Sequence, residues 1–300
     1  MIQALRTPEH RFADLPDFPW TSRYVDDLPG YEGLRVAYLD EGPKDAAHTF
    51  LCLHGEPSWS FLYRRMIPHF LASGGRVVAP DFLGFGRSDK PVEEATYTFH
   101  FHRTMLLALV ARLDLTTITL VVQDWGGLIG LTLPADKDFA ARLNRLIVMN
   151  TTLAVGQLPS PGFAAWRAFA KANPDFDVGA LMQRGTPHLT PAEAAAYGAP
   201  FPDTAYQAGV RAFPERVMTE PEMEGVEESL AAQAFWRGFT GQSFMAVGAM
   251  DPVLGPDVMA ALRADIRGCP EPMMIPDGGH FVQEWGGPIA EAALRRFGDV

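Results

Sequence analysis

The chain has 300 residues, of which 47% are hydrophobic and 20% are charged. This composition excludes a disordered or fibrous protein and allows one large globular core. The formal net charge of −11 disfavours binding to nucleic acid phosphates or to an anionic membrane surface, so we expect a small neutral molecule as the ligand.

In the first half of the chain, short apolar runs bounded by turn residues alternate with helical stretches. We predict strands over residues 34–38, 49–53, 76–79, 118–123 and 143–149, and helices over 58–73 and 99–113. This alternation is typical of a largely parallel sheet that helices cover on both faces.

The pattern changes after residue 150. Residues 151–225 are rich in Pro, Ala, Gly and aromatic residues, contain no predicted strand, and include a helix start at Thr190-Pro-Ala-Glu193. Alternation then resumes with a helix over 226–239, strands over 243–249 and 273–275, and helices after Pro256 and Pro288. We therefore predict one α/β core, formed by residues 1–150 and 226–300, and a helical cap, residues 151–225, inserted into it.

The predicted strand at 118–123 runs directly into Asp124, Trp125 and two glycines. In a nucleophile elbow, a sharp strand-to-helix turn exposes a reactive side chain at the sheet edge, and glycines let the backbones pack closely. An aspartate in this place is ionised near neutral pH and suits attack on an alkyl carbon, which would give an ester bound to the protein. The alternative is that Asp124 only caps the following helix.

Two later strand ends carry an acid and a histidine. Asp251 follows strand 243–249 and precedes a proline, and His280 follows strand 273–275 within Gly-Gly-His-Phe. With Asp124 they give the order nucleophile, acid, histidine, which is one chain order of a catalytic triad. Singly, Asp251 is also typical of a turn, and His280 of a cap or surface position. We predict that His280 takes a proton from water and that Asp251 orients its ring.

Other patterns do not indicate a cofactor. The Gly-x-Gly of residues 81–89 lacks a third glycine and a following helix, so we interpret it as a structural loop and not as a dinucleotide site. His100 and His102 lie two residues apart on a predicted helix and therefore point to different faces, which disfavours a metal site. We expect neither a metal nor an organic cofactor.

The sequence also bears on compartment and partners. It has only two cysteines, Cys52 and Cys269, and lacks an apolar stretch typical of a signal peptide or a membrane span. We expect a cytoplasmic monomer with no membrane or nucleic acid partner.

Four segments carry a resemblance to a known family. They are His54-Gly-Glu-Pro-Ser-Trp-Ser60, Ala79-Pro-Asp-Phe-Leu-Gly-Phe-Gly-Arg-Ser88, Gln123-Asp-Trp-Gly-Gly127 and Asp277-Gly-Gly-His-Phe-Val-Gln-Glu284. Over nearly its whole length the chain resembles the haloalkane dehalogenases of the α/β-hydrolase superfamily, and most of all the subfamily of the 1,2-dichloroethane-degrading enzyme. The resemblance implies a mostly parallel eight-stranded sheet flanked by helices, with an inserted helical cap. It also implies hydrolysis of a haloalkane to a primary alcohol, a halide ion and a proton through an ester of Asp124.

The same resemblance implies roles for further residues. The backbone amides of Glu56 and Trp125 would form the oxyanion hole, and the indole N–H groups of Trp125 and Trp166 would bind the halide. An indole suits a weakly hydrated anion because it donates one hydrogen bond and accepts none. The implied pocket walls are Phe82, Leu128, Phe163, Val253 and Leu254. Leu128 and Gly185 stand where the best-known relative carries larger aromatic residues, so the resemblance leaves the pocket size open.

The main alternative is an epoxide hydrolase, which uses the same three catalytic residue types and needs acid donors, usually cap tyrosines. Tyr197 and Tyr206 lie in the predicted cap, whereas Glu56 and Trp166 favour a halide. A fluoroacetate-type dehalogenase is less favoured because basic residues that would bind a substrate carboxylate are not evident near Asp124. A non-catalytic receptor on the same fold would not need all three triad residues.

Overall fold

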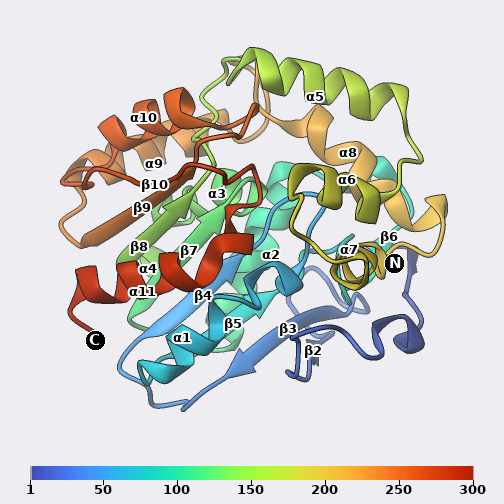
Figure 1. The fold of residues 1–300 in the computed structure, drawn as a ribbon, viewed down its shortest axis with the longest axis horizontal. Coiled ribbons are helices and arrows are strands. Elements are labelled where there is room, and N and C mark those ends of the chain that lie inside the picture. Colours follow the sequence, from blue (N-terminus) through green and yellow to red (C-terminus); the bar gives the residue numbers. More distant parts are fainter. Residues whose placement is uncertain (1, 300) are drawn as a thin grey trace.

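The centre of the molecule is a twisted eight-stranded sheet (Figure 1). The computed structural model describes residues 2–299. In spatial order, the strands are β10 (Met273–Ile275), β9 (Gln242–Gly248), β8 (Leu143–Met149), β7 (Ile118–Gln123), β4 (Thr49–Leu53), β5 (Arg76–Pro80), β3 (Val36–Glu41) and β2 (Arg23–Val25). The six strands from β10 to β5 pair in parallel, and β3 and β2 pair antiparallel at one edge. The mostly parallel eight-stranded sheet expected from the sequence is confirmed.

Strand β2 is the member of this sheet that the apolar pattern did not reveal. It has three residues, and two of them are exposed. A short edge strand buries too little to leave an apolar run in the sequence, and short edge strands are common because they limit unwanted pairing. A separate two-stranded sheet, β1 (Ala4–Leu5) with β6 (Lys90–Pro91), was likewise not predicted.

Helices cover both faces of the large sheet (Figure 1). On one face α1 (Ile67–Ala72) packs against α11 (Gly286–Phe297), and on the other lie α2 (Phe99–Arg112), α3 (Trp125–Gly130) and α9 (Val226–Gly238). The core is completed by α4 (Lys137–Ala140) and α10 (Pro256–Asp265), and by the 3-10 turns η1 (Glu9–Phe12), η2 (Ser60–Tyr63), η3 (Glu94–Thr96), η4 (Leu133–Ala135) and η6 (Val282–Trp285).

The helix predicted over 58–73 is two elements instead of one. Turn η2 ends at Tyr63, and α1 begins at Ile67 with Pro68 in its first turn. Proline lacks an N–H group and its ring clashes with the preceding helical turn, so a helix can start at Pro68 but cannot run through it. The single long helix was therefore a wrong prediction.

The segment between β8 and α9 lies over the carboxyl ends of the parallel strands (Figure 1). Its elements are α5 (Pro161–Ala172), α6 (Val178–Gly185), α7 (Pro191–Gly198), η5 (Thr204–Gln207) and α8 (Ala208–Arg216). Helix α7 begins with the predicted capping box, in which Thr190 and Glu193 each accept a hydrogen bond from the other's backbone. Helix α8 packs against α5.

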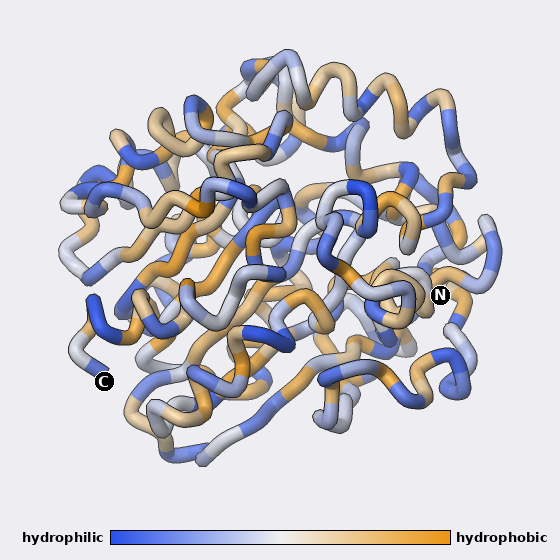
Figure 2. Tube along the Cα trace, viewed as in Figure 1, coloured by the Kyte–Doolittle hydropathy of each residue, from blue (hydrophilic) through white to orange (hydrophobic). Residues whose placement is uncertain are grey.

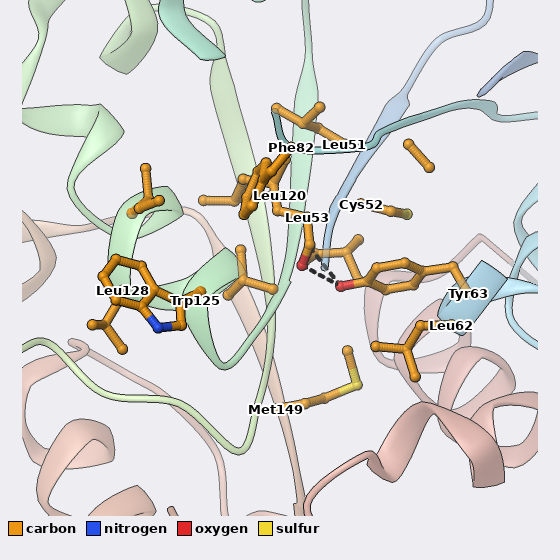
Figure 3. Packing of buried hydrophobic residues seen from close by; sticks show 14 of the residues in the cluster. Leu51, Cys52, Leu53, Leu62, Tyr63, Phe82, Leu120, Trp125, Leu128 and Met149 are labelled. Atoms are coloured by element: carbon orange, nitrogen blue, oxygen red, sulfur yellow. Dashed lines mark hydrogen bonds between the residues drawn. The ribbon is translucent and has the colours of Figure 1, made fainter. Parts of the chain in front are cut away.

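Apolar residues concentrate in the strands and on the inner faces of the helices (Figure 2). The side chains of β4, β5 and β7 are buried throughout, as expected for parallel strands covered on both faces. The buried hydroxyl of Tyr63 donates to the carbonyl of Leu53 over 2.7 Å, near the end of β4 (Figure 3). No helix in residues 2–299 is long and apolar enough to cross a membrane.

A buried ion network joins helix α7, in the segment between β8 and α9, to the residues after η2 and to η6. Arg64, after η2, donates two hydrogen bonds to Glu284 of η6, at 2.6 and 2.8 Å, and one to Glu193 of α7 at 2.8 Å. Tyr197 of α7 donates to Glu284, and Arg65 pairs with both glutamates. Burial alone would raise the pKa of Glu193, but hydrogen bonds from Arg64 and Thr190 lower it to about 2. Glu193 therefore remains ionised at neutral pH.

Candidate active site

The turn after β7 has the strained geometry of an elbow. Asp124 has φ 50° and ψ −126°, a conformation that non-glycine residues rarely adopt. A Cβ atom on Gly126 would stand 2.0 Å from the carbonyl oxygen of Leu53, and one on Gly127 would stand 2.0 Å from Thr151 Oγ1. Only glycine at these two positions lets α3 approach β4 and the segment after β8 so closely.

Asp124 does not cap the helix that follows it. Its side chain makes no capping hydrogen bond to α3. Instead Oδ1 accepts a hydrogen bond of 2.7 Å from the backbone N–H of Glu56, and Oδ2 lies 3.3 Å from His280 Nε2. The capping alternative is therefore excluded, and the carboxylate is directed across the sheet edge toward the loops after β4 and β10.

His280 stands between two carboxylates. Its Nδ1 is 2.8 Å from Asp251 Oδ2, on the side opposite Asp124. Asp251 has a fully buried side chain that also accepts hydrogen bonds of 2.8 Å from Asn150 Nδ2 and from the backbone N–H of Val253. The three residues predicted at separate strand ends thus meet in one row, in which His280 is hydrogen-bonded to Asp251 and lies 3.3 Å from Asp124.

The charges in this row reinforce one another. Burial alone would lower the pKa of His280, but the carboxylates of Asp251 and Asp124 raise it well above its usual value. Burial would likewise raise the pKa of Asp251, but His280 and the bonds from Val253 and Asn150 lower it. The imidazole of His280 therefore holds a proton at neutral pH.

Asn150 is a site residue that the sequence reasoning missed. It sits directly after β8, and besides Asp251 it bonds the backbone of Gly248 in both directions, at 2.8 Å and 3.3 Å. These bonds fix the loop that carries Asp251. Its position at a strand end was the available signal, because polar residues gather at that edge of a parallel sheet.

Glu56 brings a second carboxyl group to Asp124. Its side chain is buried, and its Oε1 has no hydrogen-bond partner among the described residues. Burial, and after it the negative charge of Asp124, raises the pKa of Glu56 well above its usual value. The Glu56 carboxyl is therefore protonated under conditions where an exposed glutamate is ionised.

We expect Glu56→Gln to stabilise the fold at pH 8 and to change it little at pH 4. The folded state keeps a proton on Glu56 that the unfolded chain releases above its ordinary pKa, so the wild type loses stability as pH rises from that value through the folded pKa. Glutamine carries no such penalty. Urea midpoints at the two pH values measure the difference, and exposed Glu222→Gln serves as the control. Equal midpoint shifts at both pH values would contradict a protonated Glu56.

A cavity of about 750 Å³ opens above the row and lies under the cap segment. Asp124, His280 and Glu56 line it, together with most of the predicted wall and halide residues: Trp125, Leu128, Phe163, Trp166, Val253 and Leu254. Trp125 and Leu128 lie close together on α3 (Figure 3). Gly185 also lines the cavity, so the positions that differ from the best-known relative do face this space.

Phe82 is placed differently from the prediction. It is fully buried and is not among the lining residues, because its backbone N–H donates to His54 Nε2 over 3.0 Å and its ring packs on that imidazole. The prediction of Phe82 as a pocket wall is therefore wrong: Phe82 instead supports the loop after β4.

Both tryptophans that are candidates for halide binding pack against aromatic neighbours. The ring of Trp125 contacts Phe213 of α8, with centroids 4.3 Å apart, and Trp166 of α5 packs with Phe169 and Phe176. Trp59, Trp236 and Trp285 each donate the indole N–H to a protein oxygen. Within residues 2–299, Trp20, Trp125 and Trp166 have no such acceptor. Of these three, Trp125 and Trp166 line the cavity, where their N–H groups are available to a ligand.

The two cap tyrosines do not meet the needs of an epoxide hydrolase. Tyr197 is buried in the ion network, where it bonds Glu284 and Arg64. Tyr206 is only partly buried, and neither tyrosine lines the cavity. An epoxide oxygen at Asp124 would therefore lack a tyrosine donor.

The segments interpreted as structural have structural contacts. Asp81 Oδ1 accepts from the backbone N–H of Ser60, and its Oδ2 accepts from that of Arg87, so it holds the loop together. His100 is 52% exposed and contacts Glu224 and Glu228, whereas His102 is fully buried. The prediction that these two histidines point to different faces is confirmed.

Comparisons with known proteins agree with this architecture. A family model described as the alpha/beta hydrolase fold matches residues 48–287. A haloalkane dehalogenase of Psychrobacter cryohalolentis is 42% identical over 99% of this chain and 98% of its own length, and one of Mycolicibacterium paratuberculosis is 40% identical over 98% of each chain. The solved haloalkane dehalogenase DpaA from Paraglaciecola agarilytica is 51% identical, with a TM-score of 0.96 and 98% of both chains covered.

These matches define first an α/β hydrolase, through the family model and the sheet topology. The full-length identities then narrow the class: the chain belongs to the haloalkane dehalogenase family and is a hydrolase that acts on carbon–halide bonds.

Proposed function

We propose that this enzyme removes halide from small neutral haloalkanes through a covalent ester on Asp124. The observation that carries the proposal is the row Asp124–His280–Asp251 beside an apolar cavity. The same cavity is lined by Trp125 and Trp166, whose indole N–H groups have no acceptor among residues 2–299. No organic cofactor or metal is required by this chemistry.

In the first step, a carboxylate oxygen of Asp124 attacks the carbon that bears the halogen. The new C–O bond forms as the carbon–halogen bond breaks, and the bonding pair leaves with the halide. Trp125 and Trp166 donate hydrogen bonds to the departing anion, which acquires its charge in the transition state and is therefore bound more tightly there than in the substrate.

In the second step, water hydrolyses the ester. Esterification removes the negative charge of Asp124, and with it part of the field that keeps His280 protonated, so the imidazolium releases its proton to solvent. The neutral imidazole can then accept a proton from the attacking water. Asp251 stabilises the resulting imidazolium. The amides of Glu56 and Trp125 hold the tetrahedral oxyanion, and collapse releases the alcohol and regenerates Asp124. The net products are alcohol, halide and a proton.

Bromide release tests the proposal against its main alternative. We expect purified enzyme to release bromide from 1-bromobutane and to leave styrene oxide unopened, with Asp124→Asn inactive on both. Opening of styrene oxide without bromide release would favour the epoxide hydrolase instead.

We expect Trp166→Phe to weaken bromide binding by about 10- to 150-fold, because it removes one hydrogen bond to an anion, worth about 1.5–3 kcal/mol. Phenylalanine keeps the aromatic packing with Phe169 and Phe176. Quenching of tryptophan fluorescence by bromide measures the affinity. Trp20→Phe is the matched control, because Trp20 is not among the residues that line the cavity. Unchanged affinity in Trp166→Phe would remove Trp166 from the halide site.

The monomer expected from the sequence remains a prediction. The relative from P. agarilytica is described as tetrameric, and at 51% identity this argues against a monomer. Sedimentation velocity of the purified protein decides between the two states.

A further inference from the structure

An arginine lies at the edge of the active-site cavity. Arg184 occupies the last turn of α6, is exposed to solvent, and lines the same cavity as Asp124 and His280. The sequence reasoning found no basic residue near Asp124, because nothing in the local pattern shows that the end of α6 faces the loop after β7.

Arg184 has no carboxylate partner among residues 2–299, and no hydrogen bond from its guanidinium to the described part of the chain is present. Arg211, also in the cap segment, illustrates the contrast, because it pairs with Glu94. A guanidinium presents five donors in a planar fork that matches a carboxylate in a bidentate arrangement. The free donors of Arg184 therefore remain available to a ligand that fills the cavity.

The position of this guanidinium is supported by aromatic packing. Its central carbon lies 5.2 Å from the centre of the Phe169 ring, and Phe169 in turn stacks with Trp166 at 5.9 Å. A guanidinium resting on an aromatic face is partly pre-ordered, so it loses less freedom when it binds. The candidate halide tryptophan and the unpaired cation thus belong to one packed unit.

We propose that the cavity accepts terminal haloalkanes whose far end carries a carboxylate, with the halogen at Trp125 and Trp166 and the carboxylate on Arg184. This inference rests on the proposed function and names a further substrate class for the same site. The methylene chain of such a substrate would lie along apolar walls that include Leu128, Phe163 and Val253.

The carboxylate of Asp277 is less suited to bind a charged ligand than the guanidinium of Arg184. Asp277 also lines the cavity, but its carboxylate accepts a hydrogen bond of 3.3 Å from Trp285 Nε1. A substrate with an ammonium end would have to share that carboxylate. The net charge of −11 repels anions at long range, so any preference for a carboxylate must come from local contact and must depend on chain length.

The test compares three bromides of one length: 1-bromohexane, 6-bromohexanoate and 6-bromohexylamine. We expect Arg184→Met to lower kcat/KM for 6-bromohexanoate, relative to that for 1-bromohexane, by about fivefold, since an exposed ion pair contributes up to about that factor. Lys171→Met, which removes an exposed cation on α5 away from the cavity lining, should leave the ratio unchanged. The loss should shrink at high salt and should peak at one length in a series from 4-bromobutanoate to 10-bromodecanoate.

Inhibition provides a readout that does not depend on turnover of a carboxylate substrate. Hexanoate should compete with 1-bromohexane, and it should compete less well in Arg184→Met. The inference is overturned if the ratio of kcat/KM for 6-bromohexanoate to that for 1-bromohexane is the same in wild type and Arg184→Met. It is also overturned if Lys171→Met lowers this ratio as much as Arg184→Met does, or if the wild type prefers 6-bromohexylamine to 6-bromohexanoate. Turnover of 1-bromohexane without any carboxylate effect overturns this inference alone, whereas absence of bromide from every substrate overturns the proposed function with it.

Discussion

Replacement of His280 by glutamine is expected to yield an enzyme that alkylates itself once and then stops. Asp124 keeps its elbow geometry and its hydrogen bond from Glu56, so the ester still forms. Without the imidazole no base removes a proton from water, and loss of a general base costs about 10²- to 10⁴-fold. Intact-protein mass spectrometry after exposure to 1-bromobutane should show one added butyl group, located on Asp124 by peptide mapping.

Two controls make this result specific. His100→Gln changes an exposed histidine outside the cavity and should turn over substrate without an adduct. Asp124→Asn combined with His280→Gln should show neither turnover nor adduct. An inactive His280→Gln that remains unmodified would mean that the covalent route is wrong or that His280 is not the base.

Glu284→Gln is expected to lower the free energy of unfolding by about 3 kcal/mol, because removal of one partner leaves a buried charge poorly compensated. Arg64 and Glu284 have fully buried side chains and pair through two hydrogen bonds. Glu193 still faces Arg64 in the variant, which places the cost at the low end for buried pairs. Urea unfolding followed by circular dichroism measures the change.

Glu291→Gln is the matched control for this prediction. Glu291 forms a half-exposed pair with Arg295 at 3.6 Å, and such pairs contribute at most about 1 kcal/mol. If Glu284→Gln and Glu291→Gln shift the urea midpoint equally, the buried network contributes no more than an ordinary surface pair.

The meeting of Asp124, Asp251 and His280 could be predicted from the sequence because buried parallel strands leave clear apolar runs. The boundaries predicted for β4, β7 and β8 match the structure, and the residues after parallel strands necessarily meet at one sheet edge. Asp124, Asp251 and His280 are 29 to 156 positions apart in the chain, yet this rule alone brings them together.

Contacts that depend on side-chain direction could not be predicted in this way. The separation of Arg64 from Glu284 is 220 residues, and an isolated charged residue gives no periodic signal of its partner. Phe82 follows a strand as Asp124 does, but its ring packs on His54 and is not among the residues that line the cavity. Arg184 was missed for the same reason, since a basic residue near a helix end is most often a favourable partner of the helix dipole.

The two candidate halide ligands belong to different parts of the molecule, Trp125 to the core and Trp166 to the segment above it. Helix α8 connects them, because its Phe213 rests on Trp125 while the helix itself packs on α5. A ligand that requires both parts to be seated together stabilises that arrangement by mass action. Under the proposed function, a bound bromide would contact Trp125 and Trp166 at once and would so hold the two parts together reversibly. The thermal stability of the enzyme and its inhibition by product would therefore rise together as halide accumulates.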